Sequence, residues 1–249
     1  MILRRLSQSL KTQNWTAIWI EFILLVAGVF LGIQVANWND SRKESMQAAV
    51  YLKNIAEDIR GDINEIDETI AVSRWRMSVL QALIVNSTGE PLPTTYILPI
   101  GVVKVQAVPA YTDAENKSLG LAYAYIRTID GNRSTYETII NTGGIGLIQN
   151  AKLLEQIQIY YADVDEIKDI ERKLQIDCDS ALLALHEAGA SPMDARKLTE
   201  LSKIIAENPK LLASSKTVWG STGHQIRILL DLRQQANALL AEIEKRNQP

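Results

Sequence analysis

The stretch WTAIWIEFILLVAGVFLGIQVANW, residues 15–38, is the longest part of the chain that is almost free of charge. Between Ala17 and Ala36 the only ionisable residue is Glu21. An α-helix rises about 1.5 Å per residue, so roughly 20 such residues cross the hydrocarbon core of a bilayer. The sequence therefore predicts one transmembrane helix over residues 16–38.

Tryptophans flank this run, as they do at membrane–water interfaces. The predicted interface belt consists of Trp15, Trp19 and Trp38. A cleaved signal peptide is the alternative interpretation, but the apolar region is too long for one and no small-residue cleavage site follows it. We therefore expect the helix to be retained as an anchor.

The basic residues around the run indicate its orientation by a small margin. Those before it are Arg4, Arg5 and Lys11, and those after it are Arg42 and Lys43. The positive-inside rule then favours a short cytoplasmic segment (residues 1–15) and a soluble domain (residues 39–249) on the other side. In a bacterial inner membrane that domain would be periplasmic.

Glu21 shares one face of the predicted span with its glycines. At 100° per residue, Gly28, Gly32 and Asn39 lie within about 20° of the Glu21 direction, and Ala36 flanks them. Small residues let a second helix approach closely, so this stripe is a predicted assembly face. Two alternatives for Glu21 remain open: its carboxylate snorkels to the headgroups, or it handles a proton or an ion.

Two later segments repeat with the seven-residue period of long packed helices. The first, residues 45–85, has Leu52, Ile59, Ile66, Ser73 and Leu80 on one heptad position and Ala56, Ile63, Ile70, Met77 and Ile84 on the other. The second, residues 150–188, has Leu153, Tyr160, Ile167, Leu174 and Ala181, alternating with Ile157, Val164, Glu171, Cys178 and Leu185. The sequence predicts an all-α bundle in which these two helices pack antiparallel.

Shorter elements separate and follow these helices. Prolines and glycines in residues 86–118 exclude a continuous helix and favour a hairpin or an extended insertion. The remaining helices are predicted over residues 119–129, from a capping box at Ser134, from residue 191 to Asn208, and from a cap at Thr222 onward. Gly143 or Gly144 is expected to end the helix that begins at Ser134.

No constellation of catalytic residues is evident, so we expect no enzyme, no cofactor and no metal site. In WGSTGH, Ser221 and Thr222 fit helix caps better than a hydrolase elbow, and NTGGIGLIQN lacks the residues of a phosphate loop. Acidic residues between Glu57 and Glu68 fit a solvated helix face better than a cation site. The net charge of −3 argues against a nucleic-acid partner.

Two parts of the chain resemble a family of uncharacterised bacterial single-span membrane proteins. The first is GVFLGIQVANWN, residues 28–39. The second comprises Tyr136, Gly143 or Gly144, Leu147, Ile148, Asn150, Leu153, Tyr160 and Tyr161. The resemblance spans about residues 4–161 and implies a membrane anchor with a helical body, but no activity.

The leading hypothesis is a non-enzymatic accessory or scaffold protein in the membrane. It would assemble through its transmembrane helix, with copies of itself or with a larger membrane complex, and the bilayer would be its other partner. The alternative is a periplasmic helical sensor of a small ligand, which would need a partner to carry the signal across the membrane.

Overall fold

The computed structural model describes residues 15–99, 101–112 and 118–246. Most of the predicted cytoplasmic segment, residues 1–14, therefore lies outside the described part. The chain divides into two compact units, Met1–Val50 and Tyr51–Pro249. The described residues are mostly helical, which confirms the all-α fold predicted from the sequence.

The first helix, α2 (Trp15–Thr88), begins in the first unit and ends in the second. Its side chains between Trp19 and Ser45 are all exposed within this chain. Among the described residues, this helix contains the one apolar segment long enough to cross a membrane. The finding supports a single-pass membrane protein.

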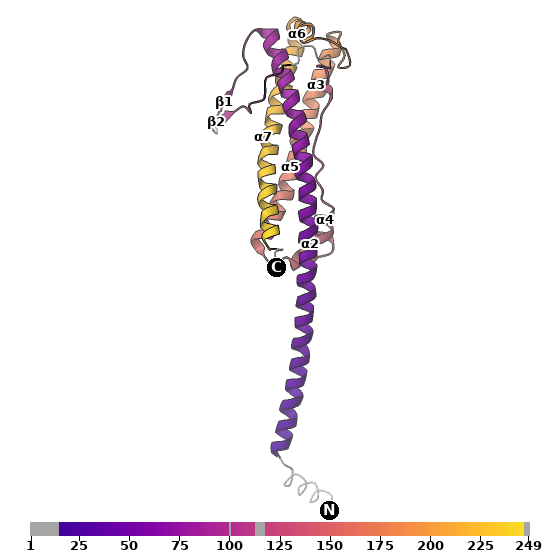
Figure 1. The fold of residues 1–249 in the computed structure, drawn as a ribbon, viewed down its shortest axis with the longest axis vertical. Helices are drawn as coiled ribbons and strands as arrows, with labels where there is room; N and C mark the ends of the chain where they lie inside the picture. Colours follow the sequence, from indigo (N-terminus) through magenta and orange to yellow (C-terminus); the bar gives the residue numbers. More distant parts are fainter. Residues whose placement is uncertain (1–14, 100, 113–117, 247–249) are drawn as a thin grey trace, which may run out of the picture. The chain divides into compact units, whose positions relative to one another are not determined.

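The second unit is a three-helix bundle. Residues 51–88 of α2 lie beside α5 (Ala151–Glu187) and α7 (Pro209–Arg246), as Figure 1 shows. The predicted heptad positions of α2 and α5 from Leu52 onward are buried or half-buried, and so is the stripe of α7 that begins at Leu229. The periodicity of the sequence thus located the core correctly.

The direction of α5 differs from the prediction. Asp62 of α2 bonds to Tyr160 of α5, and Ser73, eleven residues later, reaches Glu171 through one shared glutamine. Residue numbers therefore increase together along both helices, so α2 and α5 are parallel, and the predicted antiparallel packing is wrong. α7 supplies the antiparallel partner, because Arg60 pairs with Glu244 while Asp67 pairs with Arg233.

A parallel arrangement requires the chain to return along the bundle before α5 begins. The return starts with a hairpin in which β1 (Thr95–Leu98) pairs antiparallel with β2 (Gly101–Lys104), which confirms the hairpin alternative for the insertion. A short helix, α3 (Leu121–Ala124), follows. Residues 125–133 then form an extended segment, which we call the strap, running antiparallel to α2.

The strap replaces the helix predicted over residues 119–129, so that prediction is wrong beyond Ala124. In an α-helix, backbone N–H groups bond to carbonyls four residues earlier. In the strap, several of them bond to carboxylates of α2 and α5 instead. These distant partners override the local helical preference of the strap residues.

After the strap come α4 (Ser134–Asn141) and a short 3-10 helix, η1 (Gly144–Leu147). Gly143 ends α4 with φ of 71°, as predicted for one of the two glycines. Asn150 caps α5, also as predicted, because its side chain accepts a bond from the Leu153 N–H at 2.8 Å. Figure 1 places α4 and α6 (Leu198–Glu207) at opposite ends of the bundle.

Two predicted helix starts are wrong. No helix opens at residue 191, because the Asp194 carboxylate accepts the Ser191 N–H at 2.9 Å and closes a turn; α6 begins at Leu198. Thr222 caps nothing either, since α7 begins at Pro209 and continues through it. The Thr222 hydroxyl instead donates to the Val218 carbonyl within the same helix.

Candidate functional site

The predicted assembly face lies on the exposed part of α2. Glu21, Gly28, Gly32, Ala36 and Asn39 are all exposed and fall on one stripe of a regular helix. A Cβ added at either glycine would meet no described atom within 4 Å outside its own stretch of helix. The described part of the chain therefore leaves this stripe open to lipid or to another helix.

Two of the three predicted belt tryptophans are also exposed. Trp19 packs edge-on against Phe22, and Trp38 is 67% exposed. The side chain of Trp15 lies outside the described part of the structure. The exposure of Trp19 and Trp38 is compatible with the interface belt, which stays a prediction.

The acidic run of α2 has a structural role that its sequence did not suggest. The Asp62 carboxylate, which is buried, accepts the Asn132 N–H and the Tyr160 hydroxyl, both at 2.7 Å. Glu65 accepts the Gly131 N–H, and Asp58 accepts the Asn132 side-chain amide and the Thr135 N–H. These carboxylates therefore bind backbone donors of the returning chain, and the prediction of a solvated face is wrong for Asp58, Asp62 and Glu65.

A polar layer crosses the middle of the bundle. Glu171, 2% exposed, accepts the Ile129 N–H of the strap and the Gln225 amide of α7. Gln225 in turn accepts the Ser73 hydroxyl of α2 at 2.7 Å. The layer joins all three long helices to the strap. A shift of any helix along its axis would break these bonds, so the layer favours the observed register.

Arg76 lies close to this layer and is completely buried. Its guanidinium donates to the Tyr125 carbonyl at 2.5 Å, while Nε and Nη1 have no hydrogen-bond partner among the described residues. Burial lowers the pKa of Arg76, which the charge of Glu171 opposes. The sequence offered a signal for this layer, because Ile55, Asp62, Thr69, Arg76 and Leu83 form a third buried line at heptad spacing.

Burial raises the pKa of the Glu171 carboxyl to about 7 from its usual 4.5, against the opposing effect of its two hydrogen bonds. Its contribution to stability is therefore complete below pH 4.5 and is lost as the pH rises through 7. We expect the free energy of unfolding of the wild type to fall relative to that of Glu171→Gln between pH 5 and pH 8. The limit of this relative change is ~3 kcal/mol.

The measurement is chemical denaturation of both proteins in the same mild detergent at several pH values. The difference between the two curves isolates Glu171, because His224, whose pKa is lowered chiefly by burial, is present in both proteins. A difference that stays constant across this range would show that Glu171 keeps an ordinary pKa in the folded protein.

The tyrosines of the second sequence signature meet where α4 reaches α5. The rings of Tyr136 and Tyr161 stack with centroids 4.2 Å apart, and the Arg133 guanidinium lies over both rings. Gly144 is needed here because a Cβ would lie 2.6 Å from the Tyr51 ring. The signature thus describes a packed corner, and its glycine permits the close approach of α2.

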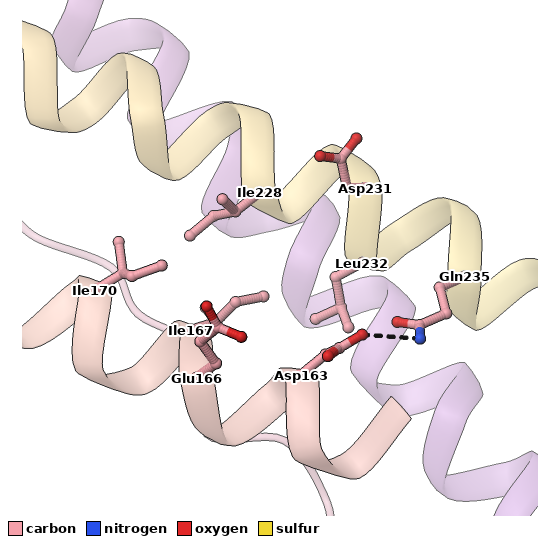
Figure 2. Close-up of a pocket in the computed structure, with 8 residues that line it drawn as sticks. All are labelled: Asp163, Glu166, Ile167, Ile170, Ile228, Asp231, Leu232 and Gln235. Carbon is pink, nitrogen blue, oxygen red and sulfur yellow. Dashed lines mark hydrogen bonds between the residues drawn. The ribbon is translucent and has the colours of Figure 1, made fainter. Parts of the chain in front are cut away.

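A groove of about 280 Å³ lies between α5 and α7. Its floor consists of Ile167, Ile170, Ile228 and Leu232, and carboxylates line its rim. Figure 2 shows Asp163 and Gln235 meeting across the gap, with the amide donating at 2.9 Å. Because this bond joins the two helices directly, we interpret the groove as part of their packing.

The WGSTGH motif does not form a hydrolytic arrangement. Ser221 donates its hydroxyl to Asp177 of α5, and both Ser221 and His224 lie inside α7. A nucleophilic serine instead donates to a histidine that removes its proton. The predicted capping role of Ser221 is also wrong, because α7 begins at Pro209 and Ser221 lies inside it.

Residues 21–87 match a family of unknown function, DUF6090. The match begins at Glu21 and covers the glycine stripe and nearly all of the bundle part of α2. It supports the resemblance to an uncharacterised family, while the second signature, at residues 136–161, lies outside it. No curated protein and no solved structure matches the chain.

Proposed function

We propose that this protein is a membrane-anchored, non-enzymatic accessory or scaffold protein that assembles through its transmembrane helix. The observation that carries the proposal is the open stripe on α2, where a carboxyl group lies in line with two glycines and no described residue covers them. Close packing of a second helix is the main use of such small residues within lipid.

The proposed partner is a second copy of this chain or a subunit of a larger membrane complex. The proposed location is a bacterial inner membrane, with the N-terminus in the cytoplasm and the bundle in the periplasm. The distribution of basic residues around the span supports this orientation. The bundle would then present its surface on the far side of the membrane.

The test is the mass and composition of the complex extracted in mild detergent from the native host, at the native level of expression. We expect a defined homo-oligomer or a stoichiometric partner that stays attached through purification. A lone monomer at all detergent concentrations would refute assembly through the span.

A periplasmic sensor is the second candidate function. It is favoured by a cavity of about 430 Å³ beside α7, a size common among small-molecule sites. A ligand in this cavity would contact α2 directly, because Met77 of α2 lines the cavity. A conformational change caused by the ligand could then be transmitted along α2. A signal would still have to pass to a partner protein, so this candidate also requires assembly.

A further inference from the structure

The cavity beside α7 has an apolar interior formed by three elements. Met77 of α2 and Trp219 of α7 are buried, and Val103 and Val105 of the hairpin segment are half-buried. The hairpin thus covers one side of a hollow whose other side is the helical bundle. Apolar contacts of this kind select a ligand with a hydrocarbon portion.

Two glycines of α7 create the space. Both lie inside the helix, where glycine is less stable than alanine. Close packing explains the glycine at position 223, since a Cβ there would lie 3.2 Å from the Met77 methyl group. Gly220 has no such reason, because a Cβ there would meet nothing within 4 Å. Among the described residues, the space in front of Gly220 is therefore open.

The ionisable side chains that the structure describes around the cavity are all basic. Lys104 comes from β2, and His224 and Arg227 come from α7; among the described residues, no acidic one contributes to the lining. Arg227 has one long ion pair, 3.8 Å, with Asp231 one helical turn away. Burial is the main cause of the lowered pKa of His224. The positive charges of Arg227 and Lys173 lower this pKa further, as expected in a region of positive potential.

Trp219 adds a polar group to the same wall. Its side chain is 2% exposed, and its Nε1–H has no hydrogen-bond partner among the described residues. A buried donor without an acceptor is unfavourable, and most such groups in folded proteins have a partner. Trp219 is thus an available donor beside an apolar cavity with a basic rim.

We propose that this cavity binds an anionic amphiphile, specifically a medium-chain fatty acid. Its hydrocarbon chain lies against Trp219 and Met77 over Gly220, and its carboxylate lies between Lys104 and Arg227. The apolar interior and the uniform sign of the rim together select this chemistry over a neutral or cationic ligand. The proposal does not depend on assembly through the span.

The test is equilibrium dialysis of labelled decanoate against the full chain in phosphatidylcholine nanodiscs, with empty nanodiscs as the blank. We expect saturable binding of one decanoate per chain above the blank. The Gly220→Leu variant, which fills the cavity, should lower the affinity at least tenfold. Decanol has the same chain without the carboxylate, and it should bind at least tenfold more weakly than decanoate.

A double charge reversal tests the rim without filling the cavity. Lys104→Glu with Arg227→Glu should weaken decanoate binding at least tenfold and leave decanol binding unchanged. The matched control is Lys152→Glu with Lys203→Glu, which changes the net charge equally at exposed sites on α5 and α6. Its decanoate affinity should equal that of the wild type. If Gly220→Leu fails to fold by circular dichroism, this pair of double variants decides the question.

The proposal is overturned if the wild type shows no saturable decanoate binding above empty nanodiscs. Equal affinities for decanoate and decanol would also overturn it, and so would equal decanoate affinities of the two double variants. None of these readouts depends on oligomeric state, so they are distinguishable from a failure of the scaffold proposal.

Discussion

Replacing Gly131 with alanine should destabilise the helical bundle by ~2–4 kcal/mol. Gly131 lies in the strap with φ of 64°, a left-handed conformation that costs an alanine about 1 kcal/mol. A Cβ there would also lie 2.7 Å from Cγ1 of Val164, a buried residue of α5. The valine is stiff about its first side-chain torsion, so the strap or α5 must shift to accommodate the new methyl group.

The matched control is Gly189→Ala. Gly189 has φ of 74°, but a Cβ there would meet nothing within 4 Å, so this variant measures the backbone cost alone. The double variant Gly131→Ala/Val164→Ala removes the collision. Its loss of unfolding free energy should be ~1–2 kcal/mol smaller than the summed losses of Gly131→Ala and Val164→Ala. Denaturant titration of the wild type, the three single variants (Gly131→Ala, Gly189→Ala and Val164→Ala) and the double variant in one detergent gives these values. Equal losses at positions 131 and 189, with additive effects, would show that the strap does not lie against α5.

Much of this fold could be predicted from local patterns in the sequence. The heptad spacing of Ile59 and Ile66 in α2, and of Leu174 and Ala181 in α5, located the buried faces because apolar burial follows helical period directly. The Asn150 cap and the Gly143 terminus were also predictable, since each depends on neighbouring residues alone.

The direction of α5 could not be predicted in the same way. It depends on the strap, in which the N–H groups of Ile129, Gly131 and Asn132 bond to carboxylates at least 42 positions away. The residues next to a carboxylate do not show whether it binds a distant backbone N–H or faces water. The continuation of α7 through Gly223 has a similar origin, because that glycine packs against Met77, which is distant in the sequence.

The candidate sites were predicted to different degrees. Glu21, Gly28 and Gly32 could be placed on one face because helix geometry alone determines which residues align. The cavity beside α7 was not found, since Lys104 and Arg227 are brought together only by the folded hairpin. The family match, which ends at residue 87, includes the first site and one wall of the second.

Substitution of the glycine stripe should have the largest effect on assembly. We expect Gly28→Leu or Gly32→Leu to weaken self-association or partner binding at least tenfold, which corresponds to about 1.4 kcal/mol. A leucine at either position holds the partner backbone away, so the close contacts along the whole stripe weaken together. The stability of the bundle should not change, since a Cβ at either position meets no described residue outside its own stretch of helix.

The matched control is Ala27→Leu, which enlarges a small residue of the same helix about 100° away from Gly28. It should assemble like the wild type in detergent extracts and in a cross-linking assay within native membranes. Variants of Glu21 test whether its side chain takes part in the contact. Glu21→Gln keeps a hydrogen-bonding group and should retain assembly. Glu21→Leu removes that group and should weaken assembly. If the carboxylate only snorkels to the headgroups, Glu21→Leu will assemble normally. If Ala27→Leu proves as damaging as Gly32→Leu, the span has no preferred face for assembly, and the glycine stripe is not the contact surface.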